Sequence, residues 1–501
     1  MTISRYLLIL DDYFGLFDHL SESEQNVELQ ANAFQKVANM PRNGISSDGF
    51  SVGPGNSPQL LRQLVAGRMN PHRVNRHDAA ALISYCRLRV LREQAKIELE
   101  VQRGRLRIAR RMQRMLLNDL KAKLVAAWDA TKKVDHHRDR QQASPFALRA
   151  RKSFLRVWLL ARAIDRQSFT AEALLRRKPK ARGGFRPIYS FDQLGIARQK
   201  LADMALTPFS SFLHQSQYTM RGRSAACEEL RQQMNRATRD TQFIQFDVTN
   251  FYGSIAHEWL EEHLPLSRAI IREHVLLDNV RVTYGKGPVR LNDEGNLGMD
   301  RRGIPQGSAV SPRVAEFVMA DILRRAADAL RGLAVIVYCD NIGILVRTSA
   351  DMTVLEKRLR RVFKTHGAGP FHLTTTGARS IATPCRFLGF HWQKTGAHVR
   401  AFLPAHVLEQ RETIYRADIS NAEGFVAMQR AYSRAKSFCS AFNLDQEVVR
   451  LSERLAVFLR AEIRHRFRRP TTTLRRLPCP SKMRRTLKKP TFRNRASVPS
   501  E

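Results

Sequence analysis

The sequence predicts an α+β protein in which a helical N-terminal region precedes a core of strands and helices. From about 77 to 131 the chain lacks proline, and its apolar residues recur at helical spacing. Farther along, 243–248, 333–338 and 342–346 are largely apolar runs with the length of strands. A short polar segment joins the last two runs, which predicts a β-hairpin with Asp340 at its tip.

The chain is strongly basic: its 501 residues include 84 Lys and Arg against 46 Asp and Glu, a net charge of +38. This excess predicts attraction to a polyanion, with nucleic acid as the first candidate and a merely soluble basic protein as the alternative. Gly104 is expected to interrupt the first helical region, and arginines cluster around it. For this cluster we prefer RNA binding to a solvated helix face. Its members are Arg103, Arg105, Arg107, Arg110, Arg111 and Arg114.

Changes in composition divide the chain into five expected regions. They are an N-terminal region at 1–75, a basic helical extension at 76–166, the core at 167–395, a helical segment at 396–466 and a disordered basic tail at 467–501. The helical segment is expected to break near Ser420. Six scattered cysteines lack zinc-ligand spacing and fit a reducing compartment. No signal peptide or membrane span is predicted, so a cytoplasmic location is expected.

Two carboxylates stand where predicted strands end. Asp247 closes the apolar run 243–248, and Asp340 lies in the hairpin turn, where Asp340 and Asn341 tolerate positive φ. A single aspartate at a strand end usually caps a turn, but two on adjacent strands suit two-metal phosphoryl transfer. Mg²⁺, or Mn²⁺ in its place, binds oxygen ligands, so the expected ligands are Asp247, Asp340 and the carbonyl of Val248.

A glycine-containing segment, 303–312, lies between the two aspartates with the sequence GIPQGSAVSP. Gly303 and Gly307 let the backbone of this segment approach a nucleotide. Ser311 and Pro312 are suited to begin a helix. A loop that merely enters a helix would explain these two residues but not Pro305, Gln306 and Gly307 as well.

These segments resemble a known family. In chain order, 246–252 (FDVTNFY), 303–312 and 338–341 (YCDN) resemble motifs A, B and C of reverse transcriptases. Upstream, 180–188 (KARGGFRPI) and, more loosely, 218–224 (YTMRGRS) resemble the fingers motifs. Downstream, Phe387, Leu388 and Gly389 begin a segment similar to the primer grip. The resemblance extends over 167–395 and implies a right-hand polymerase fold with fingers, an antiparallel palm sheet and a thumb at 396–466.

The resemblance also implies roles for residues that bind the nucleotide. Arg186, together with Lys180 or Arg182, would hold the triphosphate by charge-assisted hydrogen bonds. Tyr252 would lie against the sugar and leave no room for a ribose 2′-hydroxyl, which favours dNTPs; one of Phe251 and Tyr252 is expected in the core. The remaining nucleotide contacts are Pro305, Gln306 and Gly307, and Phe387, Leu388 and Gly389 would position the primer terminus.

The resemblance implies a catalytic set of Asp247, Asp340, Asn341 and Arg379. Two of these residues, Asn341 and Arg379, depart from the family pattern. Asn341 stands where a second aspartate is usual; it offers a neutral oxygen and removes one charge from the site. Arg379 stands where the family has a lysine that can protonate pyrophosphate. Because arginine is effectively always protonated, it can stabilise the leaving group but donates a proton poorly.

Among reverse transcriptases, the chain looks most like the bacterial defence-associated ones of the abortive-infection and unknown groups. No zinc-ligated endonuclease pattern follows the thumb segment, and the Val-Thr-Gly triplet of retron enzymes is missing. This likeness implies antiphage defence with RNA and DNA as partners, including a noncoding RNA, and in some members a second reverse transcriptase or homo-oligomer. It also implies atypical priming or templating.

Two alternatives stay open at this point. An RNA-dependent RNA polymerase would use rNTPs, against which Tyr252 argues. A noncatalytic nucleic-acid-binding scaffold with a degenerate site would be consistent with Asn341 and the charge of +38.

Overall fold

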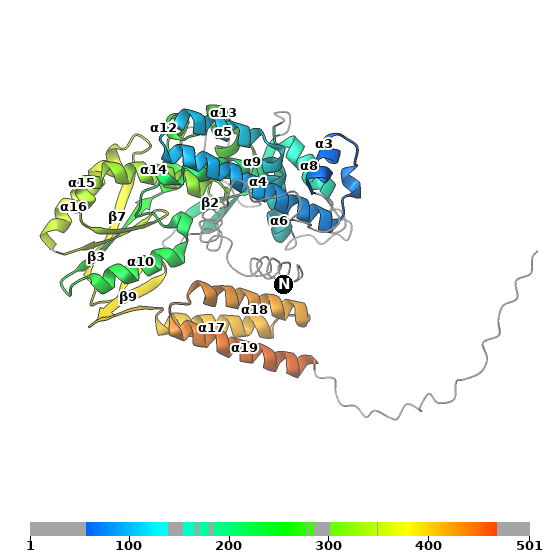
Figure 1. The fold of residues 1–501 in the computed structure, drawn as a ribbon. Coiled ribbons are helices and arrows are strands. Elements are labelled where there is room, and N and C mark those ends of the chain that lie inside the picture. The colour runs from blue at the N-terminus through cyan, green and yellow to red at the C-terminus, as the bar shows by residue number, and fades with distance from the viewer. Residues whose placement is uncertain are drawn as a thin grey trace, which may run out of the picture. The chain divides into compact units, whose positions relative to one another are not determined.

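A computed structural model describes residues 57–138, 154–165, 170–179, 184–276, 278, 280–284, 301–347 and 349–467 (Figure 1). The chain divides into two compact units, Met1–Pro404 and Ala405–Glu501. Most of the predicted N-terminal region, all but the first residue of the basic tail, and the expected triphosphate-binding residues Lys180 and Arg182 lie outside the described residues.

The first unit begins with helices formed by the proline-free region. Asn75 caps the longest of them by accepting a hydrogen bond from the Asp78 N–H at 2.8 Å. Gly104, with φ of +72°, separates two helices, which confirms the predicted interruption. The helices are α3 (Ser57–Val65), α4 (Arg76–Gln102), α5 (Leu106–Asn118), α6 (Leu120–Arg138) and α8 (Phe154–Ala163).

These N-terminal helices share one hydrophobic core with α9 (Gln193–Leu206). The last carbonyls of α9 would lack helical partners, and buried amides from the N-terminal helices satisfy two of them. Gln94 donates to the Met204 carbonyl at 2.7 Å, and Gln113 donates to the Ala205 carbonyl at 2.8 Å. The N-terminal helices are therefore built into the same core as the strands that follow.

The largest sheet has four antiparallel strands in the order β5-β6-β3-β7. These are β3 (Gln242–Thr249), β5 (Ala334–Tyr338), β6 (Asn341–Val346) and β7 (His372–Ser380). Side chains alternate along β3: Ile244, Phe246 and Val248 are buried, whereas Asp247 is exposed on the opposite face. Helices α14 (Ser311–Arg325) and α16 (Ser349–Thr365) contribute to the core below the buried face. The structure confirms the predicted α+β fold with an antiparallel sheet.

Two smaller sheets complete the strands of the first unit. One has the order β2-β1-β4, from β1 (Ala171–Pro179), β2 (Phe185–Phe191) and β4 (Val280–Tyr284). The other has the order β10-β9-β8, from β8 (Cys385–Phe387), β9 (Phe390–Thr395) and β10 (His398–Phe402).

Further helical elements connect these parts. They are η2 (Pro71–Arg73), η3 (Thr207–Phe212), η4 (Thr219–Arg221), α10 (Arg223–Arg236), α11 (Phe251–Ser254), α12 (His257–His263), α13 (Arg268–Ile270), η5 (Ile271–Val275) and α15 (Ala327–Leu330).

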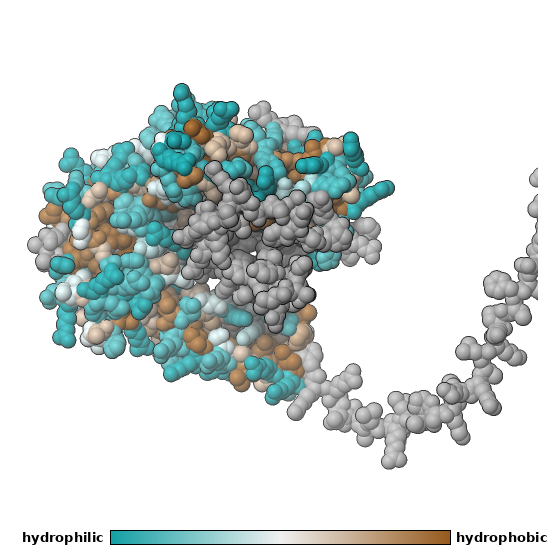
Figure 2. All heavy atoms as spheres, viewed as in Figure 1, coloured by the Kyte–Doolittle hydropathy of each residue, from teal (hydrophilic) through white to brown (hydrophobic). Residues whose placement is uncertain are grey.

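The second unit contains α17 (Ala405–Ser420), α18 (Gly424–Ala441) and α19 (Gln446–Phe467). The first of these ends at Ser420, as the sequence predicts. Ile419, Met428 and Ala431 form a small core, and Glu412 pairs with Arg416 and Arg454. On the one face that Figure 2 shows, hydrophilic residues predominate among those coloured by hydropathy. Across the described stretches, no helix is both long and apolar enough to cross a membrane.

Candidate active site

The two predicted metal-binding carboxylates lie next to each other in the structure. Asp247 on β3 is directly opposite Asn341, the first residue of β6. Tyr338 pairs with Asn341, so Cys339 and Asp340 form a two-residue turn between β5 and β6. The Val248 N–H donates to the Asp340 carbonyl at 3.1 Å. The register thus places Asp340 beside Asp247 and Val248, at one end of the sheet.

The turn differs from the prediction in the residue that takes the unusual backbone conformation. Cys339 has φ of +55°, and neither Asp340 nor Asn341 has a positive φ. Tight hairpin turns require positive φ at their first central position, and here that position belongs to Cys339. The Cys339 N–H donates to the Thr219 hydroxyl at 2.7 Å. A residue far away in the sequence therefore holds the turn.

Burial and like charge act together on Asp340. They raise the pKa of its carboxyl, burial being the larger cause and the charge of Asp247 the second. The charge of Arg186, on β2, and a hydrogen bond from Asn341 oppose this rise. The two carboxylates are therefore close enough to repel, and Arg186 is close enough to Asp340 to favour its ionised form.

Asn341 is oriented by two hydrogen bonds. Its amide nitrogen donates to Asp340 Oδ1 at 3.1 Å, and its amide oxygen accepts from Gln245 Nε2 at 3.1 Å. The expectation of an amide oxygen offered to the site needs correction, because Gln245 engages that oxygen and the nitrogen faces Asp340. An aspartate at 341 would instead bring a third negative charge to Asp340 and Asp247. Gln245 was not predicted, since nothing in its local sequence marks it.

The segment 303–312 is held between β2 and α9. The Tyr189 N–H donates to the Gln306 carbonyl at 2.7 Å, and the Ala309 N–H donates to Gln199 Oε1 at 2.9 Å. Gly307 has φ of +105°, and a Cβ there would lie 2.3 Å from the Tyr189 carbonyl oxygen. Only glycine fits this position, which explains the second glycine of the motif.

Tyr252 lies between this loop and the hairpin. Its carbonyl accepts from the Ile304 N–H at 2.8 Å. Burial, followed by the nearby Cys339 and Asp340, raises the pKa of its phenol. The Tyr252 ring meets Phe251 edge-on at 6.2 Å between centroids, and Phe251 is buried. As predicted, one of the two aromatics, Phe251, belongs to the core. Tyr252 lies near Asp340, and its contact with a sugar stays a prediction.

Arg379 is the predicted site residue that the structure leaves apart from the carboxylates. Arg379 lies on β7 and pairs with Phe243 of β3, which is four residues along β3 from Asp247, about 14 Å at ~3.4 Å per residue. Its charge acts on the thiol of Cys385, whose pKa burial raises and Arg379 lowers. A role with the leaving group therefore stays a prediction.

The segment similar to the primer grip forms a tight hairpin turn. Phe387 pairs with Phe390, and Leu388 and Gly389, with φ of +49° and +84°, make the turn between them. Phe387 is buried and meets Phe243 at 5.4 Å between ring centroids. Phe387 is thus a packing residue that fixes the hairpin to the sheet, whereas Gly389 at the turn is exposed. Primer binding by this segment stays a prediction.

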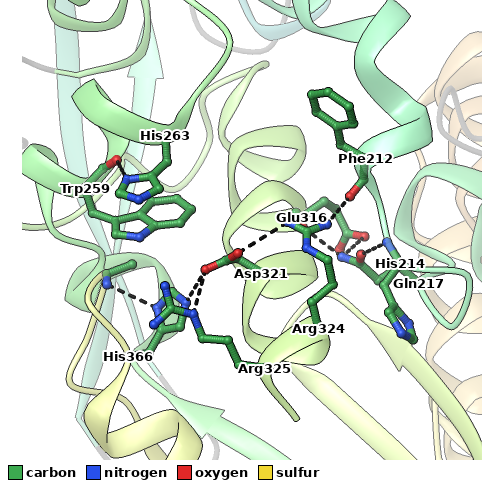
Figure 3. Close-up of polar contacts among 11 residues, drawn as sticks. Phe212, His214, Gln217, Trp259, His263, Glu316, Asp321, Arg324, Arg325 and His366 are labelled. Carbon is green, nitrogen blue, oxygen red and sulfur yellow. Dashed lines mark hydrogen bonds and ion pairs between the residues drawn. The ribbon is translucent and has the colours of Figure 1, made fainter. Parts of the chain in front are cut away.

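Helix α14, which follows the loop, is held by buried polar contacts at its far end (Figure 3). His366 Nδ1 accepts from the Ala368 N–H at 3.1 Å, so its Nε2 carries the proton donated to Asp321 at 3.0 Å. Burial lowers the pKa of His366, which favours this neutral form. Arg325 also donates to Asp321, at 3.0 Å. The His366–Asp321 contact ties α14 to the chain that follows α16, whereas the Arg325 bond lies within α14.

The candidate metal site consists of few protein groups. Over the described ranges, no group of three or more His, Cys, Asp and Glu residues is placed to hold a metal ion. Asp247 and Asp340, with the Val248 carbonyl, form a smaller set. This set suits Mg²⁺, which binds through one or two carboxylates together with substrate phosphates. The repulsion that raises the Asp340 pKa is what a divalent cation would relieve.

Residues 177–392 match the family model described as "Reverse transcriptase (RNA-dependent DNA polymerase)". The matched residues are similar to a reverse transcriptase domain and make up less than half of the chain. The match includes both carboxylates, the 303–312 loop, Tyr252 and the Phe387 hairpin. A search of curated proteins finds no match.

Solved telomerase structures show a weak likeness to the chain. The structure of telomerase from Candida albicans with a TWJ fragment of telomeric RNA is 10% identical to this chain, with a TM-score of 0.32. The match covers 60% of this chain and 61% of the telomerase chain. Apo telomerase from Candida tropicalis is 12% identical with a TM-score of 0.34, covering 60% and 59%. Its form truncated from the C-terminal domain is 14% identical with a TM-score of 0.32, covering 47% and 55%. The chain thus spans less than two thirds of each telomerase chain.

The close approach of Gly307 to β2 yields a stability prediction. Gly307→Ala should lower the free energy of unfolding by more than Gly377→Ala, measured by urea denaturation. Both glycines have positive φ, which costs an alanine about 1–2 kcal/mol, but only Gly307 also meets backbone, because Gly377 has no atom within 4 Å. Equal losses in the two variants would show that the contact with Tyr189 does not hold the loop.

Proposed function

We propose that this chain is a DNA polymerase of the reverse transcriptase kind, which adds dNTPs to a primer at Asp247 and Asp340. One observation carries the proposal: the register of β3 and β6 brings these carboxylates together, beside Tyr252, inside a domain that matches the family. The reaction joins the primer hydroxyl oxygen to the α-phosphorus. The hydroxyl gives its proton to solvent water, and pyrophosphate leaves with the electrons of the broken α–β phosphoanhydride bond.

Asp247, Asp340 and the Val248 carbonyl would hold the divalent metal ions. Bound Mg²⁺ or Mn²⁺ supplies Lewis-acid stabilisation of the charge on the phosphates and the attacking oxygen. The chain's own residues then orient the substrates. Arg186 provides a positive charge beside Asp340 for the triphosphate. The hydrogen bond from Asn341 opposes the rise in the Asp340 pKa and so favours the ionised form of this ligand.

We infer RNA and DNA as the partners, with exposed arginines of α5 as one contact surface. Arg107, Arg110, Arg111 and Arg114 are exposed, and within the described part of the chain none of them forms an ion pair with an acidic residue. Unbalanced arginines on one helix attract phosphates.

The assignment to antiphage defence with a noncoding RNA rests on motif resemblance alone. Equal phage plaque counts in cells carrying the wild type and Asp247→Ala would refute it.

The metal-ligand assignment predicts loss of synthesis in two variants. The chain, purified with co-expressed RNA, is offered labelled dNTPs or rNTPs with Mg²⁺ or Mn²⁺. Asp247→Ala and Asp340→Ala should reduce incorporation to background because each removes a metal ligand. Asn341→Asp is the comparison variant: it keeps both ligands, and because a bound divalent cation offsets its added negative charge, it should retain incorporation.

Three outcomes of this assay would contradict the proposal. Incorporation that survives either alanine variant would place synthesis elsewhere. Use of rNTPs alone would indicate an RNA polymerase. A wild type without incorporation under all these conditions would indicate a noncatalytic scaffold.

The position of Tyr252 predicts selection against ribonucleotides. Tyr252→Ala should raise the ratio of rNTP to dNTP incorporation by about tenfold or more, as expected when a pocket gains room for one small group. Steady-state kinetics with each nucleotide measures the ratio. Tyr252→Phe keeps the ring and should leave it unchanged. A ratio that stays the same in Tyr252→Ala would refute the gate.

A further inference from the structure

The catalytic hairpin is held from outside the sheet by a segment that precedes α10. Strand β5 lies at the edge of the sheet, and the edge that faces away from β6 is hydrogen-bonded to this segment, residues 214–219. The Val337 N–H donates to the Ser216 carbonyl at 2.8 Å, and the Tyr218 N–H donates to the Val337 carbonyl at 2.8 Å. The next residue, Thr219, accepts from the Cys339 N–H at 2.7 Å. The segment therefore reaches the turn that carries Asp340.

A buried acid on α14 holds the same segment. Glu316 is 1% exposed. Its Oε1 accepts from the Thr219 hydroxyl at 2.5 Å and its Oε2 accepts from Gln217 Nε2 at 2.8 Å. The Gln217 amide oxygen accepts from the His214 N–H at 2.6 Å. Figure 3 shows Gln217 lying between Glu316 and His214. Burial raises the pKa of the Glu316 carboxyl to about 7, and the bonds from Thr219 and Gln217 oppose that rise.

A carboxylate at this position is costly, since an apolar residue of similar size would pack without the loss of hydration. The direct effect of the Glu316 carboxylate is to set the direction in which the Thr219 hydroxyl points its proton. The Thr219 hydroxyl has a single proton, and that proton is donated to Glu316. The lone pairs of the oxygen are then left for the Cys339 N–H. Without the acid, the hydroxyl could rotate and turn its proton toward the N–H group.

The turn needs such a restraint because Cys339 is held at φ of +55°. A left-handed conformation is costly for a residue with a Cβ and persists only when its surroundings determine it. We propose that Thr219 and Glu316 are positioning residues of the catalytic hairpin: the Glu316 carboxylate orients the Thr219 hydroxyl, which fixes the Cys339 N–H and thereby the place of Asp340. The positioning of Asp340 for nucleotide transfer rests on the proposed function, whereas the hydrogen-bond relay does not.

The test compares Thr219→Val, Thr219→Ser and Glu316→Gln with the wild type. Thr131→Val is the control, because it removes a similarly buried hydroxyl whose bond, to the Trp128 carbonyl, lies within α6. Hydrogen exchange followed by mass spectrometry over 334–346 reports on the hairpin without any need for activity. Kinetics of dNTP incorporation report kcat and KM separately.

In Thr219→Val, the Cys339 N–H should exchange about tenfold faster, the effect of losing one buried hydrogen bond. We expect kcat to fall by a similar factor with KM for dNTP little changed. Thr219→Ser should restore both, Glu316→Gln should lie between, and Thr131→Val should match the wild type. Unchanged exchange in Thr219→Val overturns the proposal whatever the activity. Faster exchange in Thr219→Val supports the hydrogen-bond relay even if the wild type incorporates no nucleotide. That lack of incorporation would overturn the proposed function instead.

Discussion

The pairing of Asp247 with Asn341 across β3 and β6 is the constraint on which the site depends. Because side chains alternate along a strand, a slip of one residue would turn Asp247 toward the core and bring Phe246 to the surface. The buried alternation of Ile244, Phe246 and Val248 prevents that slip. The hydrophobic pattern that stabilises the sheet therefore also decides where its carboxylates meet.

The rest of the first unit can be understood as support for this end of the sheet. Tyr252 and the 303–312 loop are tied to each other through the Ile304 N–H, and the loop is tied to β2 through Tyr189. Helix α14 then extends behind the loop, bonded to the 214–219 segment at Glu316 and to His366 at Asp321. Asp340 gains a fixed position from these contacts, at the cost of burial beside a like charge.

The sequence predicted the parts of this arrangement that are local. The strands, the β5–β6 hairpin and the aspartates follow from apolar runs and short polar breaks, and Gly307 follows from a motif whose glycine the structure requires. Contacts between distant segments left no such pattern. Gln245 bonding to Asn341, Glu316 to Thr219 and Cys339 as the left-handed residue depend on the register and on α14 packing, which no window of sequence displays. The position of Arg379 on β7 likewise could not be predicted from the sequence, because the pairing of β7 with β3 is irregular near Ile244.

In the proposed site, Asp247 and Asp340 jointly hold a divalent metal ion. Electron paramagnetic resonance of Mn²⁺ titrated into the full chain with a dNTP tests it without requiring turnover. The account predicts saturable binding by the wild type, affinity weaker by about tenfold or more in Asp247→Ala and in Asp340→Ala, and no weakening in Asn341→Asp. Equal Mn²⁺ affinity in the wild type and both alanine variants would contradict it.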